Sequence, residues 1–103
     1  MGLDQYIYKM TSDGEEEVKY YRKNNQIQGF FEEHCNQQNC DYSSITPELC
    51  DLFVSSELNG ASGFFYGNNR MDDGEREEAN KLFMMIKDDI IRNKAEYSYY
   101  CWY

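Results

Sequence analysis

The segment KYYRKNNQIQGFFEEHCNQQNC (19–40) changes its periodicity partway along, and this change decides the fold. Its first residues, together with Val18, are β-branched or aromatic, which favours a β-strand over 18–22. Beyond Lys23 the apolar positions recur with the spacing of one helix face, at Ile27, Phe30, Phe31 and His34 or Cys35. The segment therefore predicts a strand that passes directly into a helix.

The flanking sequence supplies the other elements of the predicted fold. Strands are expected at 3–10, 18–22, 62–67 (SGFFYG) and 96–103. Helices are expected from Lys23, from Thr46-Pro47 to Asn59-Gly60, and from Asp72 or Asp73 to Asn93-Lys94. The order β-β-α-α-β-α-β predicts an α+β fold, a small antiparallel or mixed sheet of about four strands with about three helices packed on one face. The other face of the sheet would then carry tyrosines.

Composition predicts a single folded domain, 1–103, because 41% of the residues are hydrophobic and 17% are aromatic. The opening MGLDQYIYKM lacks the basic and apolar regions of a signal peptide, and no apolar run reaches the length of a membrane span. We therefore expect no membrane interaction. The cysteines at 35, 40, 50 and 101 are expected to be reduced thiols in the cytoplasm.

The net charge of −9 constrains the class of partner. A polyanion or an anionic membrane would be repelled, so direct nucleic-acid binding is not expected. An acidic surface can instead enter a basic protein groove in the place of nucleic acid. The alternative interpretation is that the charge serves solubility alone.

The residue types that bind metals or perform nucleophilic catalysis are sparse. His34, Cys35, Cys40 and Cys50 are the only set that resembles a zinc site, but adjacent residues on a helix do not converge on one ion. The chain has no G-x-S-x-G motif and no phosphate-binding glycine loop. We therefore expect no metal, no cofactor and no catalysis.

A polar cluster at the strand-to-helix junction is the candidate ligand pocket. It comprises Arg22, Lys23, Asn25 and Gln28, with Asp4 of the first strand as a counter-charge. Amides at a helix start and an arginine fork bind anions readily, so the cluster could receive an anionic group. Alternatively, Arg22 and Asp4 form an internal ion pair that fixes the strand against the helix.

The candidate partner-binding surface combines acids of the last helix with aromatics of the last strand. Its residues are Glu75, Glu77, Glu78, Asp88, Asp89, Tyr97, Tyr99, Tyr100 and Trp102. Tyrosine and tryptophan offer large contact areas with a polar group, which is typical of protein interfaces. The same side chains also stabilise sheets through cross-strand pairs, and both roles remain open at this stage.

Four segments together resemble a family of small, functionally uncharacterised proteins encoded by bacteriophages and bacterial genomes. They are GLDQYIYKM, YYRKNNQI, SGFFYG and YSYYCW. Family members often read Tyr-Trp-Arg-Lys-Ala-Asn-x-Ile-His in the second segment. Here Tyr20, Arg22, Lys23, Asn25 and Ile27 match, Tyr21 replaces the tryptophan and Gln28 replaces the histidine. The resemblance implies a phage or prophage origin and carries no activity with it, and glutamine cannot transfer protons as histidine does.

We therefore expect a non-catalytic phage-type protein that acts in the cytoplasm of an infected or lysogenic bacterial host. It would bind a host protein through an acidic, tyrosine-rich surface and inhibit a host enzyme or defence system, as anti-CRISPR or anti-restriction proteins do. The competing hypothesis is a small-molecule or nucleotide-binding domain, or a minimal enzyme, that uses the pocket around Arg22. A homo-oligomer formed through the tyrosines is a third alternative.

Overall fold

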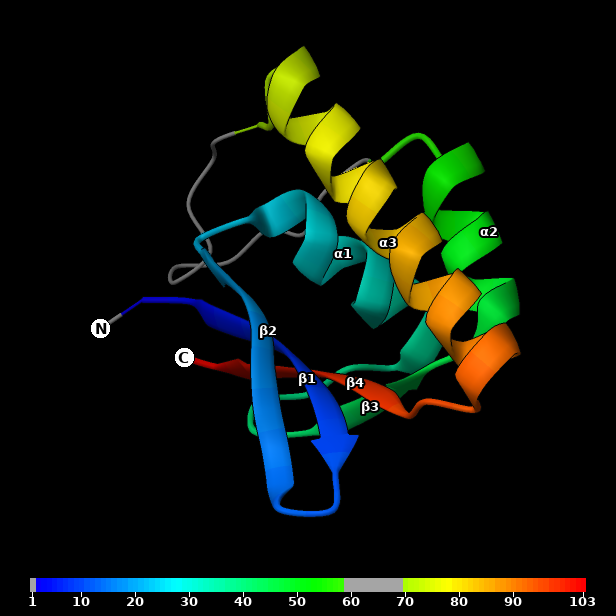
Figure 1. Cartoon of the computed structure of the whole chain (residues 1–103). Coiled ribbons are helices and arrows are strands. Elements are labelled where there is room, and N and C mark those ends of the chain that lie inside the picture. The colour runs from blue at the N-terminus through cyan, green and yellow to red at the C-terminus, as the bar shows by residue number, and fades with distance from the viewer. Residues whose placement is uncertain (1, 59–69) are drawn as a thin grey trace.

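Antiparallel strands form one layer of the structure and helices form the other (Figure 1). The computed structural model describes residues 2–58 and 70–103. Within these residues the elements are β1 (Asp4–Thr11), β2 (Gly14–Arg22), α1 (Asn25–Cys35), β3 (Tyr42–Ile45), α2 (Pro47–Ser55), α3 (Asp73–Asn93) and β4 (Tyr97–Trp102). The predicted α+β class is confirmed, with four strands and three helices in the described part of the chain.

The sheet places the first and last strands of the chain side by side at its centre. The strand order is β2-β1-β4-β3 and every pairing is antiparallel. β1 and β2 form a hairpin whose turn contains Gly14 at φ 116°, a backbone conformation that glycine adopts at little cost. β1 pairs with β4 from Asp4 opposite Trp102 to Lys9 opposite Tyr97. This central pairing fixes which side chains of β4 face the helices.

The junction between β2 and α1 forms where the change of periodicity predicts it. Lys23 turns the chain with φ 53°, and the side chain of Asn24 accepts a hydrogen bond from the Ile27 amide at 3.1 Å. Gln5 of β1 ties this turn to the sheet, because its side chain bonds both the amide and the carbonyl of Asn24, at 2.8 and 2.9 Å. The helix start is therefore capped locally and held by the sheet.

Two element assignments differ from the sequence-based prediction. Tyr42–Ile45 forms β3, although the segment around it reads as a break between helices. α2 ends at Ser55, before the expected stop at Asn59-Gly60. Arg76 of α3 donates from Nη2 to the carbonyls of Phe53 and Ser56, at 2.8 and 3.1 Å, so a tertiary contact satisfies the carbonyls at the helix end. The predicted strand at 62–67 lies outside the described residues.

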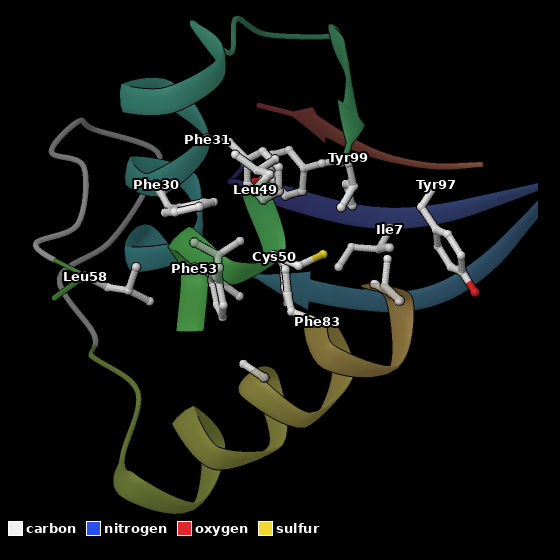
Figure 2. Packing of buried hydrophobic residues seen from close by; sticks show 14 of the residues in the cluster. Ile7, Phe30, Phe31, Leu49, Cys50, Phe53, Leu58, Phe83, Tyr97 and Tyr99 are labelled. Carbon is white, nitrogen blue, oxygen red and sulfur yellow. The ribbon is translucent and has the colours of Figure 1, made fainter. Parts of the chain in front are cut away.

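The core lies between the helices and one face of the sheet (Figure 2). Phe53 of α2 stacks on Phe83 of α3 with ring centroids 3.8 Å apart, and Phe31 of α1 stacks on Tyr99 of β4 at 3.9 Å. Ile7 of β1 adds an aliphatic side chain to this core. The helices therefore bury one face of the sheet, and Figure 1 shows them all on that side.

Candidate functional site

The opposite face of the sheet carries a row of tyrosines that crosses all four strands. The strand register aligns Tyr20 with Tyr6, Tyr6 with Tyr100, and Tyr100 with Tyr42. Neighbouring ring centroids in this row lie 5.2, 6.2 and 4.6 Å apart. Tyr8 extends the row along β1, since its ring stacks on Tyr6 at 5.6 Å with an interplanar angle of 11°.

We call this surface the tyrosine face and define it by Tyr6, Tyr8, Tyr20, Tyr42, Tyr100 and Trp102. Trp102 belongs to it because it lies two residues beyond Tyr100 on β4 and therefore on the same face of the strand. It pairs with Asp4 of β1. The exposed fractions of Tyr42 and Trp102 are 54% and 53%. Large aromatic side chains of β3 and β4 therefore face solvent.

Strand alternation divides the predicted aromatic site of β4 between two faces. Tyr97 and Tyr99 are buried on the helix side, where Figure 2 shows them among the core residues. Tyr100 and Trp102 belong to the tyrosine face. Only the second pair is therefore available to a partner, and the first pair serves the core.

The acids of α3 do not lie on the tyrosine face. Glu75 closes a capping box with Asp72, Asp88 pairs with Arg92 at 2.8 Å, and Glu77 pairs with Lys81 at 3.4 Å. α3 lies on the helix side of the sheet (Figure 1). The acids of α3 and the exposed aromatics Tyr100 and Trp102 are therefore on different sides of the molecule.

Asp89 is also engaged within the fold. Its carboxylate accepts a hydrogen bond from the Tyr97 hydroxyl at 2.6 Å and pairs with Lys9 at 2.9 Å. Hydrogen bonds from Tyr97, Asn93 and Lys9 hold the pKa of Asp89 well below its usual range. This acid ties α3 to the sheet.

Other carboxylates, from β1 and β2, border the tyrosine face. Asp4 accepts a hydrogen bond from the Tyr20 hydroxyl at 2.5 Å, and Glu15 accepts one from Tyr42 at 3.5 Å. Glu17 stands opposite Tyr8 in the register of β1 and β2. An acidic, tyrosine-rich surface is therefore present. Its acids are not those predicted for the partner surface: Asp4 was expected in the ligand pocket, and Glu15 and Glu17 were not expected in a site.

The hydroxyls of Tyr8, Tyr20, Tyr42 and Tyr100 have raised pKa values and remain protonated at neutral pH. The hydrogen bond to Asp4 raises the pKa of Tyr20, and the contact with Cys40 raises that of Tyr100 to about 12. Partial burial raises the pKa of Tyr8, with smaller contributions from Tyr42 and nearby acids. These hydroxyls can therefore donate hydrogen bonds, while the bordering carboxylates accept them.

The predicted pocket residues do not converge on one cavity. Gln28 is fully buried; it accepts a hydrogen bond from the Tyr99 hydroxyl at 2.6 Å and donates one to Glu32 at 3.0 Å. Asn25 is buried in the first turn of α1, and the Lys23 amide donates to the Leu3 carbonyl at 2.8 Å. These groups therefore stabilise the junction between β2 and α1.

Asp4 and Arg22 are directly opposite each other in the register of β1 and β2. Within residues 2–58 and 70–103, however, no ion pair of 4.0 Å or less joins them. The internal ion pair is therefore not formed here. Arg22 lines a hollow of about 320 Å³ with Asp4 and Trp102, and another of about 370 Å³ with Tyr21 and Glu75.

Three of the cysteines, Cys35, Cys50 and Cys101, and the histidine contribute to packing, whereas Cys40 is exposed. All four thiols are free, and burial raises the pKa of Cys50 to about 11. His34 packs on Phe30 with ring centroids 4.6 Å apart. Among the described residues, no group of three histidines, cysteines or acids is arranged to hold a metal ion. A thiol with a raised pKa is also a poor nucleophile at neutral pH.

Comparisons with known proteins give no match: no family model, no curated protein and no solved structure is significantly similar to the chain. Among the described residues, no helix has both the length and the apolar character needed to cross a membrane.

Tyr42, Glu15 and Glu17 are the surface residues that the sequence analysis missed. Tyr42 and Ser44 alternate with buried Ser43 and Ile45 in the structure, but the sequence Tyr-Ser-Ser-Ile shows no apolar alternation that would place Tyr42 on a strand face.

Proposed function

We propose that this chain is a non-catalytic, phage-type accessory protein that binds a host protein through the tyrosine face. The observation that carries the proposal is the row of aromatic rings across four strands, opposite the face that the helices cover. Tyrosine and tryptophan are enriched where protein interfaces gain most of their affinity, because each buries a large ring and keeps a polar group. The protein would act in the cytoplasm of an infected or lysogenic bacterium.

Sheet stability alone does not require so much aromatic surface in water. Cross-strand aromatic pairs contribute about 0.2–1 kcal/mol each, and the contacts of Tyr6 and Tyr100 supply such pairs at the sheet centre. Trp102, Tyr42 and Met10 nevertheless keep 53%, 54% and 43% of their surface exposed. Contiguous exposed apolar area of this kind marks interaction sites.

The acidic border indicates how binding could inhibit a host enzyme. Asp4, Glu15 and Glu17 place carboxylates beside aromatic rings. Such a surface is complementary to a basic groove that normally holds nucleic acid, and opposite potentials accelerate association. Occupation of that groove would exclude the nucleic acid.

The proposal can be tested by affinity capture from a host lysate with three tagged forms of the protein. The forms are wild type, Tyr42→Ala/Trp102→Ala, and a charge-reversed α3 variant, Glu77→Lys/Asp88→Lys. Both altered surfaces are solvent-exposed, so circular dichroism should show that each variant folds. We expect one host protein to be retained by wild type and by the α3 variant, and to be lost with Tyr42→Ala/Trp102→Ala.

Two results would contradict the proposal. A specific partner that the Tyr42→Ala/Trp102→Ala variant still captures would place binding elsewhere. A defined oligomer of the wild type in light scattering, converted to a monomer by the same variant, would show that the tyrosine face binds a second copy of this chain.

A small ligand at Arg22 is the second candidate function, because this arginine lines three adjacent hollows. A thermal-shift screen with nucleotides and small anions separates the two functions. A ligand at 100 times its dissociation constant should stabilise the fold by about 2.7 kcal/mol, and Arg22→Gln should abolish the shift. If no compound shifts the melting temperature, the Arg22 pocket is refuted.

A further inference from the structure

We infer that a hollow at the hairpin end of the tyrosine face receives an arginine side chain of the partner protein. This inference rests on the proposed function and names the chemistry of the group that the face recognises. The hollow has a volume of about 490 Å³ and lies where the turn between β1 and β2 approaches the start of β4. The residues that line it include Met10, Tyr42, Ile45, Glu15 and Glu96.

The charge of the hollow selects a cation. Glu15 and Glu96 are both among the lining residues, and none of the residues that line it is a lysine or an arginine. The nearby Lys9 is directed to the other side of the sheet, where its ammonium pairs with Asp89 at 2.9 Å. Two acidic residues and no basic residue therefore line the hollow, so its charge favours a cation.

The walls of the hollow fit the stem and the head of an arginine. The exposed side chain of Met10 offers apolar surface to the methylene groups, which arginine packs while its charged end remains polar. The exposed ring of Tyr42 offers a face to the planar guanidinium, and Glu15 lies at hydrogen-bond distance from the Tyr42 hydroxyl. Stacking and forked hydrogen bonding favour arginine over lysine here.

The charge on the tyrosine face also distinguishes between a host partner and a second copy of this chain. Among the described strand residues that point to this face, Arg22 is the single cation, whereas Asp4, Glu15 and Glu17 are acids. Two copies that joined this face would bring like charges together, which is unfavourable. The occupant is therefore a basic segment of another protein.

The inference can be tested without the host protein, by NMR titration of the ¹⁵N-labelled chain with a short blocked peptide that contains one arginine among glycines and serines. The same peptide with citrulline in place of arginine keeps the shape and removes the charge. We expect the arginine peptide to shift the amide signals of Glu15, Tyr42 and Glu96. The citrulline peptide should bind at least about fivefold more weakly, and added salt should weaken the arginine peptide.

A matched pair of variants assigns the binding to the hollow. Glu15→Gln/Glu96→Gln and Glu77→Gln/Glu78→Gln remove the same number of charges, but only the first pair belongs to the hollow. The first variant should abolish the shifts and the second should retain them. Equal binding of citrulline and arginine, or shifts that survive the first variant, would overturn the assignment.

Capture of the host partner by two variants distinguishes a failure of this inference from a failure of the proposed function. A partner that is lost with Tyr42→Ala/Trp102→Ala but still captured by Glu15→Gln/Glu96→Gln would overturn the arginine site and leave the tyrosine face as the interface. A partner that binds both variants would overturn the proposed function itself. Loss of the partner with both variants supports both.

Discussion

Replacement of Tyr99 by phenylalanine should lower the free energy of unfolding by about 2 kcal/mol, although it removes a single oxygen atom. The ring of Tyr99 is fully buried against Phe31, and this stacking is kept in the variant. The hydroxyl donates to Oε1 of Gln28 at 2.6 Å and accepts from Nε2 of Gln5 at 2.9 Å. The variant therefore isolates the contribution of a buried polar network.

The magnitude follows from what each partner of Tyr99 retains. Nε2 of Gln5 keeps the Asn24 carbonyl as a second acceptor at 2.9 Å. The Gln28 carbonyl loses its Tyr99 donor, and because Gln28 is fully buried no solvent can replace that donor without rearrangement. A buried acceptor that loses its partner costs about 1–3 kcal/mol, and we expect the middle of this range.

Urea denaturation monitored by circular dichroism measures the effect, and the slope with urea concentration should not change. For a domain of this size, the expected loss corresponds to a fall of about 8–16 °C in melting temperature. Tyr42→Phe is the control, because its hydroxyl reaches Glu15 at 3.5 Å on the exposed face and its loss should cost less than about 0.5 kcal/mol. If Tyr99→Phe cost no more than this control, the network would not stabilise the fold.

Two further predictions concern stability. Because the pKa of Asp89 is depressed in the folded state, its carboxylate stabilises the fold above its unfolded pKa of about 3.9 and this stabilisation is lost as the pH falls below that value. Asp89→Asn weakens the contacts with Lys9 and Tyr97 and should therefore lower the melting temperature at neutral pH. The melting temperature of the variant should also decrease less than that of wild type between about pH 5 and pH 2. The same decrease in both proteins would contradict this prediction. Phe53→Ala should cost about 3–5 kcal/mol, since Phe53 stacks on Phe83 at 3.8 Å in the core, and a urea midpoint close to that of wild type would refute the packing.

The helices could be predicted from the sequence because their signals are local. Thr46 caps α2 and accepts from the Leu49 amide at 3.1 Å, as the Thr46-Pro47 start predicts. Asp72 caps α3, and Lys94 ends it in the left-handed conformation. The end of α2 could not be predicted, because Arg76 determines it from another helix.

β3 could not be predicted because four residues are too few to establish a period. Tyr42–Ile45 is held by its pairing with β4, from Tyr42 opposite Tyr100 to Ile45 opposite Tyr97. A partner that is distant in the sequence therefore defines this strand. Tyr42, the most exposed aromatic of the tyrosine face, was missed for the same reason.

The sequence predicts Gln28 in a surface pocket, because a glutamine beside a strand-to-helix junction is typically polar and accessible. Its burial depends on Tyr99, which lies 71 positions away in the chain. A buried amide is stable only when such partners are present, and they become adjacent only after folding. Local sequence therefore could not distinguish a ligand-binding glutamine from a core one.

Local sequence also could not show which aromatics of β4 belong to the candidate site, because β4 is aromatic on both of its faces. Tyr99 and Tyr100 are adjacent in the sequence, yet one is bonded in the core and the other contributes to the open row. A shift of one residue in the pairing of β1 with β4 would exchange their positions, and Tyr100 would then lie opposite Gln5 or Ile7. The hydroxyl contacts of Tyr99 with Gln5 and Gln28 favour the observed register. The buried network that stabilises the fold is therefore also what presents Tyr100 on the surface that we propose for binding.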